Sequence, residues 1–384
     1  MKTYEEINKK IANKECVVVT AEEIIELVNE RGEKKVAEEV DVVTTGTFGA
    51  MCSSGIYLNF GHAEPPIKMQ KAWLNGIFAY CGLAAVDAYI GATELDTELN
   101  LRYGGAHVIE DLVRGKEVHL HAIGYPTDCY PRKMIDTSIS LKTVNQAVMF
   151  NPRNAYQNYG VATNSSNKTL YTYMGRLSPN FGNANYATAG QLSPLLNDPY
   201  YKTIGIGTRI FLGGTQGYVV WEGTQFKSNV PRTNGGVPMQ PAGSLGVIGD
   251  LKEMNSEYIQ ALSIPKYGVS LGVGVGAPIP LLNEEMVRYT SVRDRDIYTA
   301  VYDYSSPSRN RSILDEVTYE QLRGGFITIK GKEVPTRPLS NYKKARKIAE
   351  TLKKWIENGE FFLQEPIQRF PLDKCLKTLD SKRR

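Results

Sequence analysis

The chain has 384 residues, of which 42% are hydrophobic and 22% charged, and this composition is typical of a soluble globular protein with two or three domains. The formal net charge of +4 is too small to favour nucleic-acid binding, although it suits small anionic substrates. Five cysteines are an odd number, which argues against a disulfide framework and for a reducing cytoplasm. No apolar run is long enough to cross a bilayer, and the charged N-terminal segment lacks the pattern of a signal peptide. We therefore expect no membrane association.

The N-terminal part predicts two helices and then a buried strand. Thr3 and Glu6 have the spacing of a capping box, and so do Thr20 and Glu23. The second helix has apolar residues on one face and should end near Gly32. The segment "VDVVTTG" that follows is typical of a buried strand leading into a loop.

Between residues 69 and 133 the pattern changes several times. Residues 69–90 are apolar nearly all round, which predicts a buried helix, and residues 106–114 predict a shorter one. The segment "EVHLHAIG" alternates in polarity and predicts a strand with one buried face. It leads into "YPTDCYPRK", a loop with a cysteine between two prolines.

The rest of the chain falls into two parts of different composition. Residues 150–330 are rich in glycine, tyrosine, asparagine and β-branched residues, and runs such as "TIGIGTRIFLGG" and "YGVSLGVGVG" predict short strands joined by glycine turns. Further on, apolar residues from Ala345 to Ile356 recur at helical spacing, with Gly359 as the stop and "EVPTRPL" as a linker before the helix.

These elements predict a mixed α/β fold in which a sheet-rich central region is wrapped by N- and C-terminal helices. We expect one catalytic region over residues 1–365 and a basic tail over 366–384. The catalytic region would comprise a helix-and-strand part (1–149), a glycine- and strand-rich part (150–330) and a helical part (331–365).

Two cysteines lie in segments that suit a reactive thiol. Cysteine acts as a nucleophile or sulfur carrier in its thiolate form, which nearby cations and backbone amides favour. Cys129 precedes Arg132 and Lys133 by three and four residues. Cys52 lies in "GAMCSSG", where small residues allow backbone amides to converge on an anion.

The other three cysteines fit simpler interpretations. A free cysteine is more often a small buried hydrophobic residue than a catalyst. Cys81 lies in the apolar segment "IFAYCGLAAV" and Cys16 lies beside three valines, so both are expected in the core. Cys375 lies in the basic tail.

The histidines give one candidate for proton transfer. His62 follows Cys52 by ten residues, and its side chain titrates near neutral pH, so it is a candidate acid or base. His119 and His121 alternate on the predicted strand. Without a third ligand nearby they predict a structural pair, and we expect no metal site.

The glycine cluster "GIGTRIFLGGTQG" allows two interpretations. The amides around Gly207, Gly213 and Gly214, together with Arg209, could hold a substrate carboxylate. The same glycines could simply permit tight turns at strand ends. The sequence lacks the P-loop pattern and the full dinucleotide-binding spacing, so neither ATP nor NAD is expected.

Several long segments together resemble a known family. The segments "CSSGIYLNFGHAEPPIKM", "YPTDCYPRK", "PAGSLGVIGDLKEM" and "YGVSLGVGVGAPIPLLNEE" are similar, in the same order, to the homocysteine-biosynthesis family of anaerobes and methanogenic archaea. The resemblance covers roughly residues 1–365. It implies a cytoplasmic sulfurtransferase of homocysteine and methionine biosynthesis, which inserts sulfur from a sulfide or persulfide donor into L-aspartate semialdehyde.

The resemblance also implies roles for residues and partners. The two cysteines central to the family match Cys52 and Cys129, and we expect Cys129 to carry sulfur as a persulfide with Cys52 as its partner. His62 and Arg132 would assist. No tightly bound cofactor is expected in this chain. A ferredoxin-like protein, with any iron–sulfur cluster in that partner, would supply electrons in trans, because longer members append CBS-type or ferredoxin modules where this chain has a basic tail. We also expect a homo-oligomer.

Two alternatives remain open. In the first, an iron–sulfur cluster held by Cys52, Cys81 and Cys129 binds the transferred sulfur, although these cysteines lack the close spacing of many ferredoxin-type sites. In the second, the chain is a non-catalytic sulfur carrier that releases homocysteine only when another enzyme is present.

Overall fold

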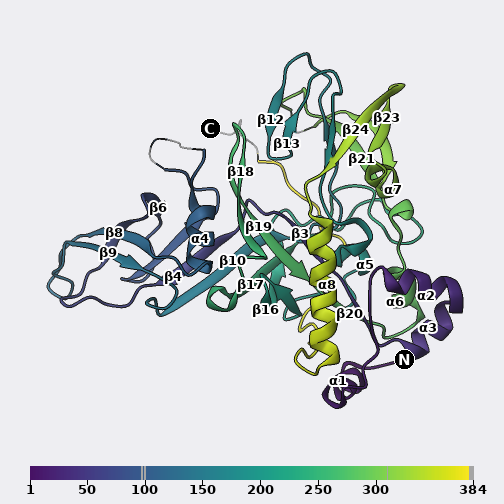
Figure 1. Ribbon diagram of the computed structural model, residues 1–384, viewed down its shortest axis with the longest axis horizontal. Helices are drawn as coiled ribbons and strands as arrows, with labels where there is room; N and C mark the ends of the chain where they lie inside the picture. Colours follow the sequence, from purple (N-terminus) through teal and green to yellow (C-terminus); the bar gives the residue numbers. More distant parts are fainter. Residues whose placement is uncertain (97, 99–100, 309, 380–384) are drawn as a thin grey trace.

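Helices lie towards both ends of the chain and sheets occupy its centre in the computed structural model, which describes residues 1–379 except 97, 99, 100 and 309 (Figure 1). The predicted mixed α/β fold with a sheet-rich central region is confirmed. The α-helices are α1 (Tyr4–Asn13), α2 (Glu23–Arg31), α3 (Glu33–Glu39), α4 (Gly105–Val113), α5 (Pro194–Asn197), α6 (Glu284–Thr290), α7 (Tyr319–Arg323) and α8 (Tyr342–Glu357), and 3₁₀-helices span Gly190–Leu192, Leu251–Glu253 and Asp294–Asp296.

The largest sheet has nine strands in the order β18-β19-β15-β16-β17-β10-β4-β7, with β3 paired to β19 outside this path. The strands are β3 (Thr47–Ala50), β4 (Gly55–Asn59), β7 (Asp87–Gly91), β10 (Gln146–Asn154), β15 (Arg209–Leu212), β16 (Thr215–Glu222), β17 (Leu245–Asp250), β18 (Ile259–Ile264) and β19 (Gly268–Gly276). Helix α8 packs against β19 and β3. Glycine permits this close approach, because a Cβ atom at Gly274 or Gly276 would lie within 2.9 or 2.7 Å of Ile348 on α8.

A second sheet has six strands in the order β22-β21-β11-β14-β24-β23. Its strands are β11 (Val161–Thr163), β14 (Ala184–Tyr186), β21 (Tyr298–Asp303), β22 (Ile313–Thr318), β23 (Phe326–Ile329) and β24 (Lys332–Pro338). The prediction of a linker at "EVPTRPL" is wrong, because this segment forms most of β24 and pairs with β14 and β23. Val334 of this strand is fully buried in the core of the second sheet, so burial and strand pairing prevail over the two prolines.

A third sheet has four strands in the order β6-β5-β8-β9 and lies at one end of the molecule (left in Figure 1). Its strands are β5 (Met69–Leu74), β6 (Ile77–Ala79), β8 (Val118–Gly124) and β9 (Met134–Ile139). The predicted helix over 69–90 is wrong, because this segment forms β5, β6 and β7. Asn75 and Gly76, with φ of 50° and 80°, make the two-residue turn between β5 and β6.

The remaining local predictions are largely confirmed. Thr3 and Glu6 form a complete capping box at the start of α1. The predicted strand at 118–124 is β8, with Val118, Leu120 and Ala122 buried. Helix α8 buries the apolar stripe expected from the sequence, and Gly359 lies just beyond its end with φ of 77°. Two small sheets complete the fold, β1 (Val18–Thr20), β2 (Val42–Thr44) and β20 (Pro278–Pro280) in one and β12 (Leu170–Thr172) and β13 (Gly175–Leu177) in the other.

The interior contains two main apolar cores. The larger core includes side chains from the nine-stranded and four-stranded sheets and from α2 and α4. The second core belongs to the six-stranded sheet and α7. Among the described helices, none is both long enough and apolar enough to cross a membrane.

Candidate functional site

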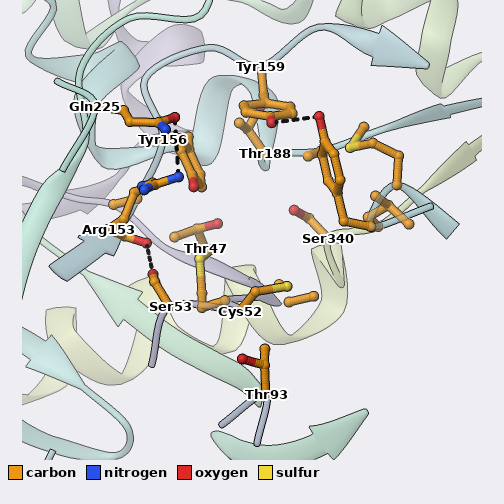
Figure 2. Close-up of a pocket in the computed structure, with 18 of the residues that line it drawn as sticks. Thr47, Cys52, Ser53, Thr93, Arg153, Tyr156, Tyr159, Thr188, Gln225 and Ser340 are labelled. Carbon is orange, nitrogen blue, oxygen red and sulfur yellow. Dashed lines mark hydrogen bonds between the residues drawn. The ribbon is translucent and has the colours of Figure 1, made fainter. Parts of the chain in front are cut away.

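A cavity of about 520 Å³ lies where the nine-stranded sheet meets the six-stranded sheet (Figure 2). One side of the cavity is formed by β3, the turn after β3, the end of β10 and the turn between β18 and β19. The opposite side comes from the β12–β13 turn and from the segments that follow β14 and β24. A concave site of this size is suited to a small-molecule ligand.

Cys52 lies in the turn between β3 and β4 and lines this cavity. Its side chain is half-buried, and its Sγ atom accepts a hydrogen bond from Ser270 Oγ at 3.3 Å. The turn is held on both sides. Ser54 donates its amide to the Met51 carbonyl at 3.1 Å, and Asn151 Nδ2 donates to Ser54 Oγ at 2.8 Å. The thiol therefore has a fixed position facing the cavity.

Arg153 contributes a cation to the same cavity. It lies near the end of β10, and its main-chain carbonyl accepts a hydrogen bond from Ser53 Oγ at 3.2 Å. The guanidinium donates from Nε to Thr224 Oγ1 at 2.9 Å. It also donates from Nη1 to Gln225 Oε1 at 3.3 Å (Figure 2). Among the described residues that line the cavity, Arg153 is the single one with a charged side chain.

Tyrosines form much of the remaining wall. Tyr156, Tyr159, Tyr173 and Tyr267 all line the cavity, and Tyr159 donates its hydroxyl to that of Tyr173 at 3.2 Å. Burial raises the pKa of Tyr156, and burial and then the neighbouring Tyr173 raise that of Tyr159. The phenols of Tyr156 and Tyr159 are therefore neutral at physiological pH, and they present aromatic faces and hydroxyl groups rather than charge.

Cys129 lies outside this cavity, in the exposed loop between β8 and β9. Its described polar contact is with Thr127, whose Oγ1 lies 3.5 Å from the cysteine Sγ. The two cysteines belong to opposite ends of β4. Cys52 lies just before this strand, whereas Arg132, which follows Cys129, hydrogen-bonds to Glu64 and Pro65 after it. That strand has five residues and is roughly 17 Å long at about 3.3 Å per residue. Within one chain the structure therefore does not bring the two thiols to one cavity.

His62 and Arg132, the two predicted assisting residues, belong to the surroundings of Cys129. The His62 ring stacks on Tyr130 with 6.1 Å between ring centroids. Arg132 donates its Nε to the Pro65 carbonyl at 2.8 Å and its Nη2 to the Glu64 carbonyl at 2.5 Å. Arg132 thus ties the β8–β9 loop to the segment after β4. Neither residue is among those that line the cavity.

The predicted substrate ligands lie elsewhere on the nine-stranded sheet. Arg209 begins β15, and its Nη1 donates to the Phe362 carbonyl at 3.3 Å. Gly213 and Gly214, with φ of 63° and 101°, make the turn between β15 and β16, where a Cβ atom would meet Met254 or Asn255. Gly207, with φ of 90°, packs against Ile367. These positions account for the glycines by backbone geometry, and their role as substrate ligands stays a prediction.

Cys16 and Cys81 are buried, as expected from the sequence. Burial raises the pKa of the Cys16 thiol to about 12 and that of Cys81 to about 11. Cys375 is exposed near Asn229. Within the described parts of the chain, no group of three or more histidine, cysteine or acidic side chains is arranged to hold a metal ion. Cys52, Cys81 and Cys129 are therefore not gathered as cluster ligands in the single chain.

Sequence reasoning missed Arg153 and the tyrosines that share its cavity. Arg153, Tyr156 and Tyr159 all occur in "NPRNAYQNYG", in which the arginine lies near the end of a strand. A cation at the end of a strand is a usable signal, because side chains at strand ends often line binding sites. The contribution of Tyr173 and Tyr267 required the folded structure, because they come from different turns.

A half-buried thiol in a small-molecule cavity with one cation and hydroxyl-rich walls is compatible with cysteine chemistry on a small substrate. The family model described as "Homocysteine biosynthesis enzyme, sulfur-incorporation" matches residues 16–363. The chain belongs to this family.

Two relatives are similar over nearly the whole chain. A protein of Methanosarcina acetivorans named L-aspartate semialdehyde sulfurtransferase is 53% identical over 98% of this chain and 74% of its own length. A protein of the same name from Methanocaldococcus jannaschii is 54% identical over 96% of this chain and 73% of its own length. An uncharacterized protein of Methanothermobacter thermautotrophicus is 29% identical over 84% of the chain. No solved structure matches.

Proposed function

We propose that this protein transfers sulfur to L-aspartate semialdehyde to form L-homocysteine, with Cys52 as the residue that carries the sulfur. The names of the two similar relatives support the overall reaction. The observation that supports the choice of Cys52 is its position on the wall of the cavity, with Ser270 holding its sulfur and Arg153 nearby.

The chemistry suits a persulfide on Cys52. The terminal sulfur of the persulfide attacks the aldehyde carbon, and the carbonyl oxygen becomes a hydroxyl group. Two electrons and two protons then cleave the sulfur–sulfur bond, releasing the Cys52 thiol and a thiol-substituted alcohol. Loss of water gives a thioaldehyde, and a further two electrons and two protons give the CH₂–SH group of homocysteine.

The electrons come from outside the chain in this proposal. We assign them to a ferredoxin-like protein, as the family resemblance implies, because the two reductions consume four electrons and Cys52 is the single thiol among the described residues that line the cavity. Cys129 is exposed on the β8–β9 loop, so it is accessible to a sulfur donor or to a second chain. The alternative is that Cys129 carries the persulfide, and the experiment must distinguish the two cysteines.

The test is to treat the purified protein with a persulfide donor and to locate the added sulfur by mass spectrometry of the intact chain and of its peptides. We expect one sulfur atom on the peptide that contains Cys52. Addition of L-aspartate semialdehyde with a chemical reductant should then remove that sulfur and yield homocysteine. Sulfur found on Cys129 alone, and transferred from there, would contradict the proposal.

A carrier without turnover of its own is distinguished in the same assay. If sulfur loads on Cys52 but homocysteine forms only after another enzyme is added, the chain is a sulfur carrier. We expect homocysteine from the loaded chain, substrate and reductant alone.

A further inference from the structure

We infer that Arg153 binds the carboxylate of the substrate and thereby sets the specificity of the cavity for short aldehydes that carry a carboxylate. This inference rests on the proposed function, because it assigns a second role within the same cavity. It concerns recognition, whereas the proposed function concerns the sulfur that Cys52 carries.

The charge of the cavity is the first observation. Arg153 is the single charged side chain among the described residues of the lining, and none of the ion pairs found in the described chain involves it. A cation that lines a cavity and has no acidic partner among the described ion pairs is available to pair with an anionic ligand. The cavity therefore favours a ligand with a negative charge.

The hydrogen bonds of Arg153 are the second observation. A guanidinium has five N–H donors in a planar fork that matches a carboxylate. Thr224 and Gln225 account for two of these donors. Three donors remain, and a bidentate carboxylate needs two. The two neighbours also hold the guanidinium in place, so little conformational freedom is lost when a ligand binds.

The position of Arg153 relative to the thiol is the third observation. Strands β4 and β10 are antiparallel and pair Phe150 with Gly55, so their register runs towards placing residue 153 opposite residue 52. The hydrogen bond from the Ser53 hydroxyl to the Arg153 carbonyl shows that the two segments remain adjacent beyond the ladder. Figure 2 shows Arg153 and Cys52 both lining the cavity.

The inference also fixes how a four-carbon substrate would lie. In L-aspartate semialdehyde the carboxylate carbon and the aldehyde carbon are about 4 Å apart in an extended chain. With its carboxylate on Arg153, this short chain would direct its aldehyde towards the part of the cavity that Cys52 lines. Because the described lining offers no acidic side chain, the ammonium group of this substrate would meet tyrosine faces and hydroxyls.

The experiment measures equilibrium binding of two probes that cannot undergo the reaction. L-homoserine has the carbon chain, ammonium and carboxylate of the substrate with an alcohol in place of the aldehyde. L-homoserine lactone has the same skeleton without a free carboxylate. Titration calorimetry with the full chain would compare wild type, Arg153→Gln, Arg153→Lys and, as a control, Arg288→Gln, whose arginine is exposed and paired with Glu33.

We expect wild type and Arg288→Gln to bind L-homoserine at least tenfold more tightly than the lactone. Arg153→Gln should bind L-homoserine about 100-fold more weakly than wild type, and Arg153→Lys about tenfold more weakly, because lysine keeps the charge but loses the fork. Lactone binding should be the same in all four proteins.

Equal binding of the two probes by wild type would overturn the inference, and this comparison needs no variant to fold. So would unchanged binding of L-homoserine by Arg153→Gln, or no binding by wild type. Sulfur loading of Cys52 is measured separately. If Arg153→Gln loads sulfur normally but loses probe binding, both proposals stand, whereas a wild-type chain that binds L-homoserine but never loads Cys52 contradicts the proposed function alone.

Discussion

The turn that carries Cys52 and the loop that carries Cys129 give two thiols very different surroundings. The Cys52 turn is tied to β10 and β19 by side-chain hydrogen bonds and faces the cavity of about 520 Å³. The Cys129 loop is exposed, and the Arg132 side chain fastens it to the rest of the chain through hydrogen bonds to the main-chain carbonyls of Glu64 and Pro65. The sequence can therefore indicate two candidate reactive thiols, but the fold is needed to show that Cys52 lines a cavity and Cys129 does not.

The largest effect expected from this difference is on turnover. Cys52→Ala should reduce homocysteine formation by at least about 1,000-fold, because the sulfur-carrying nucleophile is lost. In the matched variant, Cys129→Ala, sulfur loading of Cys52 should be unchanged. The measurements are homocysteine yield and peptide mass mapping. Loss of sulfur loading at Cys52 in Cys129→Ala would contradict this prediction.

The second effect is on the rates at which the five cysteines react with iodoacetamide at pH 8. We expect Cys129 to react quickly, and L-homoserine to protect Cys52 but not Cys129. Cys16 and Cys81 should be slowest, because burial raises their pKa values to about 12 and about 11, so that at pH 8 about one thiol in 10³ to 10⁴ is a thiolate.

The pH dependence of this labelling has a definite sign. Rates at the two buried thiols should rise about tenfold for each pH unit from pH 8 towards their pKa values, provided that the protein stays folded. Quantitative mass spectrometry of the labelled peptides measures all five rates in one sample. Protection of Cys129 by L-homoserine would show that the loop contributes to the binding site after all.

The smallest effect is expected from Ser270→Ala. Loss of the hydrogen bond to Cys52 Sγ should slow sulfur loading about tenfold, because one such bond contributes about 1.4 kcal/mol. Ser263→Ala on the neighbouring strand is the control, since its hydroxyl donates to the Arg102 carbonyl at 3.4 Å. Stopped-flow or quenched mass analysis gives the loading rates. Equal rates in both variants would show that Ser270 does not position the thiol.

Much of the local structure followed from the sequence. The capping box at α1, the alternating strand β8 and the apolar stripe of α8 each depend on residues close together in the chain. The helix predicted over 69–90 was wrong because apolar residues on all sides fit buried strands equally well. The "LNGI" turn at Asn75 and Gly76 was the overlooked signal for a hairpin.

The site was predictable only in part. Cys52 could be chosen from its small neighbours, because those neighbours determine local backbone geometry. The distance between Cys52 and Cys129 could not be predicted, because the two residues are 77 positions apart in the sequence and their separation in space depends on how the sheets pair. The same limit applies to Arg153, whose cavity is completed by Tyr173 and Ser340 from other strands' ends.

The lining of the cavity extends from Thr47 to Ser340 and draws on turns of separate sheets. As a result, no contiguous fragment shorter than residues 47–340 contains the whole lining. A fragment ending at residue 330 would keep both candidate thiols and yet lack β24 and the wall contributed by Leu339 and Ser340. Attempts to minimise this protein, or to graft its chemistry onto another scaffold, would have to preserve at least that span of the polypeptide.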